Sequence, residues 1–396
     1  MFALATTVSQ HFKEGFLTLR FFFRISKSKT LSSLLWRAVR IYYVEKNKPS
    51  FQQPKILGKN LHNSSHAALQ TKTFTFAANF FKPVKLQFIM SLIAVGTMAF
   101  DAIETPFGKI DQIVGGSALY VAYAASNFIT PIQQISIVGY DFPQEEMAEL
   151  KKRGVQLEGV EVVPDKKSFF WSGKYHVDMN TRDTLVTDLN VLADFNPTVP
   201  ESYQGAEFVM LGNLSPHIQL SIINQLKVRP KLIVMDTMNF WMEIALDDLK
   251  AVLKKVDVLM VNDGEARQLS GEVSLVKAAK VIMEMGPEYV VIKKGEHGAL
   301  LFHKNHVFSA PGLPLEEVFD PTGAGDTFAG GFIGHLAKTK DISFENMKTA
   351  IIVGSALASF CVEKFGPNRM KEITKKDIEV RLQEFVQLVN FDIDVV

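Results

Sequence analysis

Short apolar runs alternate with segments of helical spacing from Met90 onward, and this alternation most restricts what the chain can fold into. A mostly parallel sheet flanked by helices has this pattern, so an α/β fold is predicted. The predicted strands lie at residues 91–96, 134–138, 207–211, 232–236, 256–261 and 289–293. The predicted helices between them lie at residues 118–128, 216–226, 246–254 and 275–285, with three more at 327–337, 345–362 and 374–389.

Two segments do not follow the alternation. Residues 102–114 place Pro106 and a Phe-Gly-Lys sequence between two short runs, which favours a β-hairpin, and residues 168–177 are β-rich and aromatic. Together they predict a small β lid that projects from the main sheet and covers a site.

Charge divides the chain near residue 89. Residues 1–89 hold 14 Lys/Arg and two Glu, whereas the remaining 307 residues hold 29 basic and 40 acidic side chains. We expect residues 90–396 to form the catalytic domain and residues 1–89 to be a basic, non-catalytic tail. Three interpretations of the tail stay open: a mis-assigned start upstream of Met90, an organelle transit peptide, or a basic arm for a membrane or nucleic acid.

Composition excludes several other classes of protein. A single cysteine, Cys361, excludes an internal disulfide framework and a multi-cysteine metal site. No apolar run reaches about 18 residues, so no membrane-spanning helix is predicted. We expect the domain to be cytoplasmic, or organellar if the tail is a transit peptide, and to need neither a membrane nor a nucleic acid as partner.

The sequence Asp-Pro-Thr-Gly-Ala-Gly-Asp at residues 320–326 carries the chemistry. Gly323 and Gly325 flank Ala324, so the backbone can turn tightly and direct its N–H groups at one anion at a helix start. Asp326 stands beside that anion site, where its carboxylate would repel the anion unless it takes a proton from a hydroxyl that attacks a phosphoryl group. The structural alternative is an Asp that only caps the helix. The Walker and His-Glu-x-x-His motifs are absent.

Residues 320–331 closely resemble the C-terminal signature of the ribokinase-like, or pfkB, carbohydrate kinases. The resemblance extends over roughly residues 90–389 and implies an α/β sandwich with a β lid and ATP as phosphoryl donor. It also implies that Asp326 is the catalytic base and that Gly323, Ala324 and Gly325 form the anion hole. Lid strands of some members pair between subunits, so a homodimer is one expectation.

The resemblance also implies a nucleotide side of the site. The Asn-Asp-Gly-Glu sequence from Asn262 to Glu265 is similar to the family's Asn-x-x-Glu element, which orders magnesium and water near the phosphates. Glu265 has the alternative of a solvated carboxylate at a helix start. Lys294, Gly295 and Gly298 resemble the turn that approaches the nucleotide, and residues 356–366 resemble the segment that flanks adenine. Asp320 and Thr322 match positions that in some members help to hold a monovalent cation such as K⁺.

The acceptor side is less regular. The resemblance places Asp101 where the family holds substrate hydroxyls, and Gly115 and Gly116 match its N-terminal Gly-Gly motif. Ser117 and Tyr120 stand where many members carry Asn or Lys, so the sugar is not identified, and Tyr120 has the alternative of a core aromatic. Weaker candidates for substrate contact are Asn213, Asp236, Asn239, His176 and Arg182.

These residues together predict an ATP- and magnesium-dependent kinase of a hydroxyl on a small sugar or sugar-like molecule. Two alternatives remain at this point. One is a nucleoside kinase of the same fold, since a ribose 5′-hydroxyl can use the same site. The other is a catalytically silent relative that serves as a binding protein, although Asp326 and both glycines of the turn are present.

Overall fold

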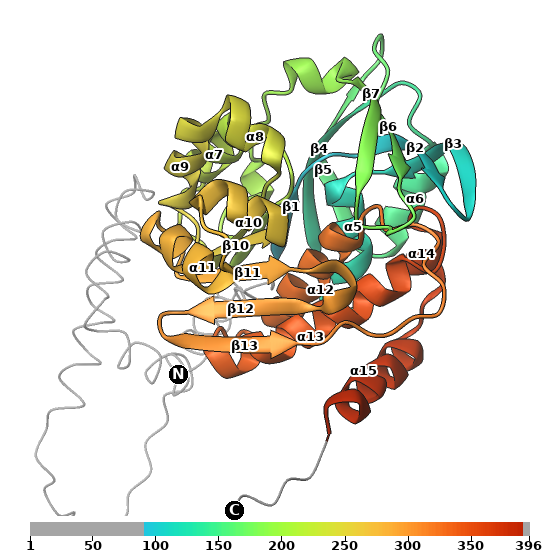
Figure 1. The fold of residues 1–396 in the computed structure, drawn as a ribbon. Coiled ribbons are helices and arrows are strands. Elements are labelled where there is room, and N and C mark those ends of the chain that lie inside the picture. Colours follow the sequence, from blue (N-terminus) through green and yellow to red (C-terminus); the bar gives the residue numbers. More distant parts are fainter. Residues whose placement is uncertain (1–90, 391–396) are drawn as a thin grey trace, which may run out of the picture. The chain divides into compact units, whose positions relative to one another are not determined.

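The computed structural model describes residues 91–390 and shows the predicted α/β architecture (Figure 1). Within these residues the main sheet has nine strands in the order β13-β12-β11-β10-β9-β8-β1-β4-β5. Neighbouring strands run parallel, except that β12 is antiparallel to both of its neighbours, β11 and β13. The strands are β1 (Leu92–Val95), β4 (Ile132–Gly139), β5 (Val155–Val163), β8 (Phe208–Leu211), β9 (Leu232–Asp236), β10 (Val258–Asn262), β11 (Tyr289–Lys293), β12 (Ala299–His303) and β13 (His306–Ala310). The predicted tail, residues 1–89, lies outside the described residues.

Helices cover both faces of this sheet because its strands are apolar on both sides. In β1, Leu92 and Ala94 pack into one core, whereas Ile93 and Val95 pack into the other. The first core includes α5 (Ser117–Ala125), α6 (Gln144–Lys152), α12 (Ala324–Thr339), α13 (Phe344–Cys361), α14 (Asn368–Glu372) and α15 (Lys375–Val389). The second includes α7 (Pro216–Gln225), α8 (Asn239–Ile244), α9 (Leu246–Leu253), α10 (Asp263–Ser270) and α11 (Leu275–Glu284).

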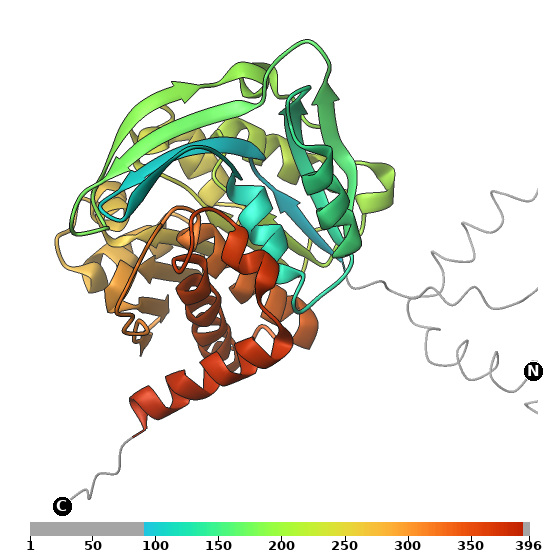
Figure 2. The ribbon, with the colours of Figure 1, turned by 90° about the vertical axis from the view of Figure 1, so that its right-hand side faces the viewer.

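A second sheet of four strands forms the lid, in the order β3-β2-β6-β7 (Figure 2). Its strands are β2 (Ala99–Thr105), β3 (Gly108–Gly115), β6 (Phe169–Tyr175) and β7 (Arg182–Asp188). The predicted hairpin is the antiparallel pair β2–β3, and the predicted aromatic strand is β6. The sequence did not predict β7, because every residue of this edge strand is exposed and no apolar alternation marks it.

Two predicted positions need correction. The helix expected from residue 327 begins at Ala324, because Thr327 N–H already donates to Gly323 O at 2.8 Å. The hairpin was expected from residue 102, but its first strand β2 already begins at Ala99 and so contains Asp101, since the chain turns directly from β1 into the lid. Among residues 91–390, none of the helices combines the length and apolarity that a membrane crossing requires.

Candidate active site

Three neighbouring parallel strands end at one edge of the main sheet and bring their last residues together. Asp236 ends β9, Asn262 ends β10 and Lys293 ends β11. The register pairs Asn262 with Lys293 across β10 and β11, and Met260 with Asp236 across β10 and β9. Ligands of open α/β sheets bind at such carboxyl ends.

The start of α12 offers free N–H groups for an anion. Gly323 has φ 76°, in the left-handed region, and the next three residues are already helical. Within residues 91–390, neither the N–H of Gly325 nor that of Asp326 donates a hydrogen bond to another protein atom. Two unpaired donors at the positive end of a helix suit a phosphate oxygen.

Tyr120 explains why residue 323 must be glycine. A Cβ at this position would lie 2.3 Å from the Cε2 and Cζ atoms of the Tyr120 ring, which is only 1% exposed. The interpretation of Tyr120 as a core aromatic on α5 is confirmed, since this side chain is fully buried. Among the described residues its hydroxyl has no hydrogen-bond partner.

Asp326 lies in a crowded, negatively charged environment although water still reaches part of the residue. Burial and the charge of Asp236 raise the pKa of the Asp326 carboxyl to about 7, while Lys293 and Arg182 act in the opposite direction. A carboxylate with this pKa is a stronger base than an ordinary aspartate and is still about half ionised at pH 7. These properties suit a general base for a hydroxyl.

Glu265 and Asn262 form a capping box at the start of α10. The Asn262 side chain accepts from Glu265 N–H at 2.8 Å, and Glu265 Oε2 accepts from Asn262 N–H at 2.8 Å. Burial and the charge of Asp236 raise the pKa of Glu265 to about 7. Because the capping box uses only Oε2, the Oε1 oxygen is available for a hydrated divalent cation, and the carboxylate faces the same edge as Asp236 and Lys293.

Asp101 is held inside the lid beside the Gly-Gly motif. A Cβ on Gly115 would lie 1.9 Å from Asp101 Oδ2, so only glycine leaves room for this carboxylate. Asp101 is 5% exposed, and burial, followed by the charges of Asp320 and Asp326, raises its pKa to about 8. The influence of the Asp320 and Asp326 charges on the pKa of Asp101 indicates that the lid brings Asp101 toward the start of α12.

The other two residues predicted on the acceptor side shape the turn after β1. A Cβ on Gly116 would lie 2.4 Å from Thr97 O, which requires a glycine there. Ser117 N–H donates to Thr97 Oγ1 at 3.0 Å, and Thr97 N–H donates to Ser117 Oγ at 3.1 Å. Ser117 is therefore occupied by a reciprocal bond to Thr97 and supports the Gly-Gly turn.

The predicted nucleotide turn follows β11. Lys294 N–H donates to Gly298 O at 2.8 Å and closes the turn. Gly295 and Gly298 have φ of 56° and 82°, which side chains rarely adopt. A Cβ on Gly295 would lie 2.4 Å from Asn180 Oδ1, so the loop between β6 and β7 lies against this turn.

Asp320 joins two segments behind the anion turn. It is fully buried, and its two oxygens accept the N–H groups of Thr322 and Gly366, each at 2.8 Å. Burial raises the pKa of Asp320 despite these bonds. The Thr322 hydroxyl donates to the hydroxyl of Tyr175 in lid strand β6 at 3.1 Å, so the lid also contacts this turn.

The weaker candidates fall into two groups: Asp236 and Arg182 influence the charges of the site, and Asn213, Asn239 and His176 form the second group. Asp236 lies in the site, and Arg182 reduces the effect of burial on the carboxyl pKa of both Asp101 and Asp326. Asn213 accepts from Trp241 Nε1 at 2.9 Å. Asn239 is the first residue of α8, and His176 pairs with Asp183 on the lid at 2.9 Å.

Sequence reasoning missed Lys293, which it treated only as the end of a strand. Lys293 Nζ lies 2.5 Å from Asp236 Oδ2 and 3.0 Å from the position of a Cβ on Gly325. Burial opposes its charge, but Asp236 and Glu265 outweigh burial and hold the pKa of the ammonium above its usual value. The available signal was a charged residue at the end of an apolar predicted strand, next to two other strands with polar ends.

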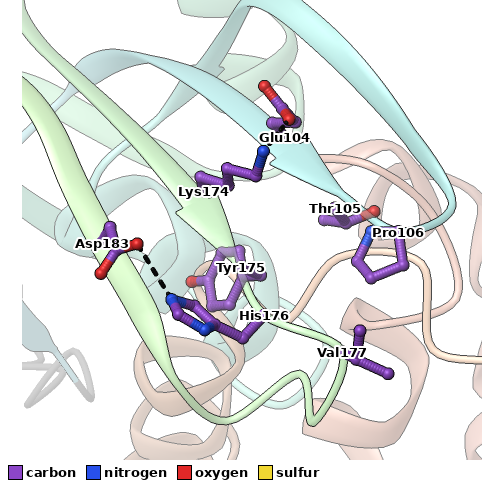
Figure 3. A pocket seen from close by; sticks show the side chains of 8 residues that line it. All are labelled: Glu104, Thr105, Pro106, Lys174, Tyr175, His176, Val177 and Asp183. Carbon is purple, nitrogen blue, oxygen red and sulfur yellow. Dashed lines mark hydrogen bonds and ion pairs between the residues drawn. The ribbon is translucent and has the colours of Figure 1, made fainter.

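A cavity of about 400 Å³ lies on the lid, and Asp326 is not among the residues that line it (Figure 3). The Lys174–Glu104 ion pair at 2.7 Å and the His176–Asp183 hydrogen bond at 2.9 Å border it. Tyr175 also lines this cavity and connects it to Thr322 through the hydroxyl bond. We place the candidate active site at the strand ends and the start of α12, because the free N–H groups and the carboxylates converge there.

Comparison with known proteins identifies relatives over most of the described residues. A family model for pfkB family carbohydrate kinases matches residues 91–374. A cytidine kinase of Thermococcus kodakarensis is 27% identical over 259 residues, covering 64% of this chain and 91% of that protein. A nucleoside kinase of Methanothermobacter thermautotrophicus is 25% identical over 304 residues, covering 69% of this chain and 90% of that protein. A ribokinase of Haemophilus influenzae is 36% identical over 129 residues, covering 31% of this chain and 39% of that protein.

Solved structures confirm the predicted ribokinase-like fold. A nucleoside kinase of Methanocaldococcus jannaschii superposes with a TM-score of 0.61 at 20% identity, covering 74% of this chain and 98% of that one. A ribokinase of Thermotoga maritima superposes with a TM-score of 0.60 at 19% identity, covering 74% and 99%. At these identities the likeness establishes the architecture, a large mostly parallel sheet with a small second sheet, and leaves the acceptor to other arguments.

Proposed function

Because the chain belongs to the pfkB family of carbohydrate kinases, we propose that it transfers the γ-phosphoryl group of ATP to a ribose hydroxyl with Asp326 as base. Membership makes the protein a phosphotransferase with an alcohol group as acceptor. The observation that carries the assignment of the base is the adjacency of Asp326 to the free N–H groups at the start of α12. A proton acceptor and an anion cradle at one point are what phosphoryl transfer to a hydroxyl requires.

The proposed reaction is a direct transfer between two substrates. Acceptor hydroxyls donate hydrogen bonds to Asp101, which favours its ionised form over the protonated form of the free site, and the reacting hydroxyl is turned toward Asp326. Asp326 takes the hydroxyl proton as the oxygen bonds to phosphorus, while the N–H groups of Gly325 and Asp326 hold the charge that spreads over the phosphoryl oxygens. The bond from phosphorus to the bridging oxygen breaks, and ADP leaves with that electron pair.

Two cations fit the described residues. Kinases of this family use ATP with a divalent metal, and we propose magnesium, held through water by Glu265 Oε1 and near Asn262. When bound, it neutralises charge on the β- and γ-phosphates. We also propose a potassium ion near Asp320 and Thr322, because each Asp320 oxygen accepts one backbone N–H and retains a lone pair.

We favour a nucleoside over a free sugar as acceptor. The two relatives aligned over about nine-tenths of their own length are named cytidine kinase and nucleoside kinase, whereas the ribokinase match covers 39% of that protein. In the lid, Trp171 pairs with Asp101 across β6 and β2, so an indole ring stands on the same face as the carboxylate that would bind the ribose. A nucleobase can stack on such a ring.

A phosphorylation screen tests the proposal. The full chain is incubated with ATP and magnesium and with cytidine, other nucleosides, ribose, fructose and polyols, and product is measured by mass spectrometry. We expect 5′-phosphorylation of at least one nucleoside, and a rate lower by about two to four orders of magnitude for Asp326→Asn. Transfer to free sugars alone would refute the nucleoside assignment, and an Asp326→Asn variant with more than about a tenth of the wild-type rate would refute the base.

A further inference from the structure

The proposed reaction assigns no role to Lys293. Its ammonium lies at the carboxyl edge of the main sheet, between Asp236 of β9 and the Gly325 turn of α12. Its register partner is Asn262, which opens the capping box with Glu265. A cation therefore stands between the proposed anion cradle and the proposed metal side.

The Asp236 contact holds this ammonium in place. Lys293 Nζ lies 2.5 Å from Asp236 Oδ2, and the two side chains are 17% and 8% exposed. An ammonium has three N–H donors, and within residues 91–390 Asp236 is the one hydrogen-bond partner of Nζ. The other donors are free for a ligand on the side of the Gly325 turn.

The distance to Gly325 sets what the free donors can reach. A Cβ at Gly325 would lie 3.0 Å from Lys293 Nζ, so the absent side chain leaves the ammonium open toward the turn. An oxygen bound by the N–H of Gly325 would lie beside both the backbone donors and this cation. A positive charge next to a phosphoryl oxygen is worth more in a water-poor site than in solution.

We propose that Lys293 is a further catalytic residue, whose ammonium, oriented by Asp236, donates a hydrogen bond to the phosphoryl group held at the Gly323–Gly325 turn. This inference rests on the proposed function, because it takes the turn as the place of phosphoryl transfer. Lys293 neutralises part of the charge that spreads over the phosphoryl oxygens, and Asp236 is a positioning residue.

The competing interpretation is an ion pair that only stabilises the end of the sheet. A buried pair of this kind loses stability when one partner is removed, since the other charge is left uncompensated. Removal of both charges together is often nearly neutral for stability. The two interpretations therefore differ in what a double neutral variant does to the rate.

The experiment compares four variants of the full chain: Lys293→Met, Lys293→Arg, Lys293→Met with Asp236→Asn, and Lys371→Met. The last is a matched control, because Lys371 pairs with the buried Glu146 at 2.6 Å, linking α14 to α6. Thermal melting, kcat, and Kd for ATP and AMP by calorimetry are measured for each. AMP lacks the β- and γ-phosphates, so its affinity reports the part of the site that holds the nucleoside and the α-phosphate.

We expect Lys293→Met to lower kcat by about 100-fold or more, the usual loss for one preorganised donor. ATP affinity falls by about tenfold or more while AMP affinity stays unchanged. Lys293→Arg keeps part of the rate, and the double variant regains melting temperature but not rate. Lys371→Met loses melting temperature and keeps kcat.

Two results would overturn the inference. One is a double variant that recovers both stability and rate, because the pair is then only structural. The other is an equal loss of ATP and AMP affinity in Lys293→Met. If the wild-type chain phosphorylates no acceptor, the proposed function fails, but the ATP and AMP affinities still decide whether Lys293 contacts the phosphates.

Discussion

Replacing Gly323 by alanine should damage both stability and rate, and the structure separates two causes. The residue has φ +76°, where a non-glycine residue costs about 1–2 kcal/mol. The added methyl would also lie 2.3 Å from ring atoms of Tyr120, a side chain that is 1% exposed and part of the core. Overpacking of this kind costs about 1–3 kcal/mol, so the total loss is about 2–5 kcal/mol.

Gly271 supplies the matched control. It has φ +73°, almost the same backbone conformation, but a Cβ there would meet nothing within 4 Å. Gly271→Ala should therefore lose only the backbone part, about 1–2 kcal/mol. The free energy of unfolding of both variants is measured by urea denaturation, and the difference between them measures the clash with Tyr120.

The rates complete this test. Gly323→Ala displaces the N–H groups of the anion turn, and a misplacement of about 1 Å can cost roughly 100-fold in kcat. Gly271→Ala should keep the wild-type kcat, because it lies at the far end of α10 from the capping box. Equal losses of unfolding free energy in the two variants, or an unchanged kcat in Gly323→Ala, would refute the role assigned to Tyr120 and the turn.

Four further predictions concern the rest of the site and the tail. With an Asp326 pKa of about 7, the ionised base is lost as pH falls, so kcat/KM should drop about tenfold from pH 8 to pH 6; a flat profile would contradict the assignment. Glu265→Gln should raise the magnesium concentration needed for half-maximal rate more than it changes acceptor KM; an unchanged magnesium titration with weaker acceptor binding would place Glu265 elsewhere. Asp101→Ala should weaken the acceptor by about 1.5–3 kcal/mol per lost hydrogen bond and leave ATP affinity intact, as measured by calorimetry with each ligand; the reverse pattern would exclude Asp101 from the acceptor pocket. Deletion of residues 1–89, which lie outside the described residues, should leave melting temperature and kcat unchanged; a truncated protein that melts many degrees lower would show that the tail belongs to the fold.

The sequence by itself determined the features that depend on neighbouring residues. The α/β class follows from the alternation of apolar runs and helical spacing, which records the period of each element. The anion turn was also predictable, because Gly323, Gly325 and Asp326 lie within one turn of chain and their geometry is local. The Asn262–Glu265 capping box is likewise contained in four consecutive residues.

Only the tertiary structure decided which distant residues meet. Asp236 and Lys293 are far apart in sequence, and their contact exists because β9, β10 and β11 lie side by side in one register. Tyr120 reaches Gly323 only because α5 packs against α12. Strand order and helix packing come from the burial of both sheet faces, a property of the whole core. No local pattern in a single sequence encodes strand order or helix packing. The charge environment of Asp326 therefore became visible only in the folded chain.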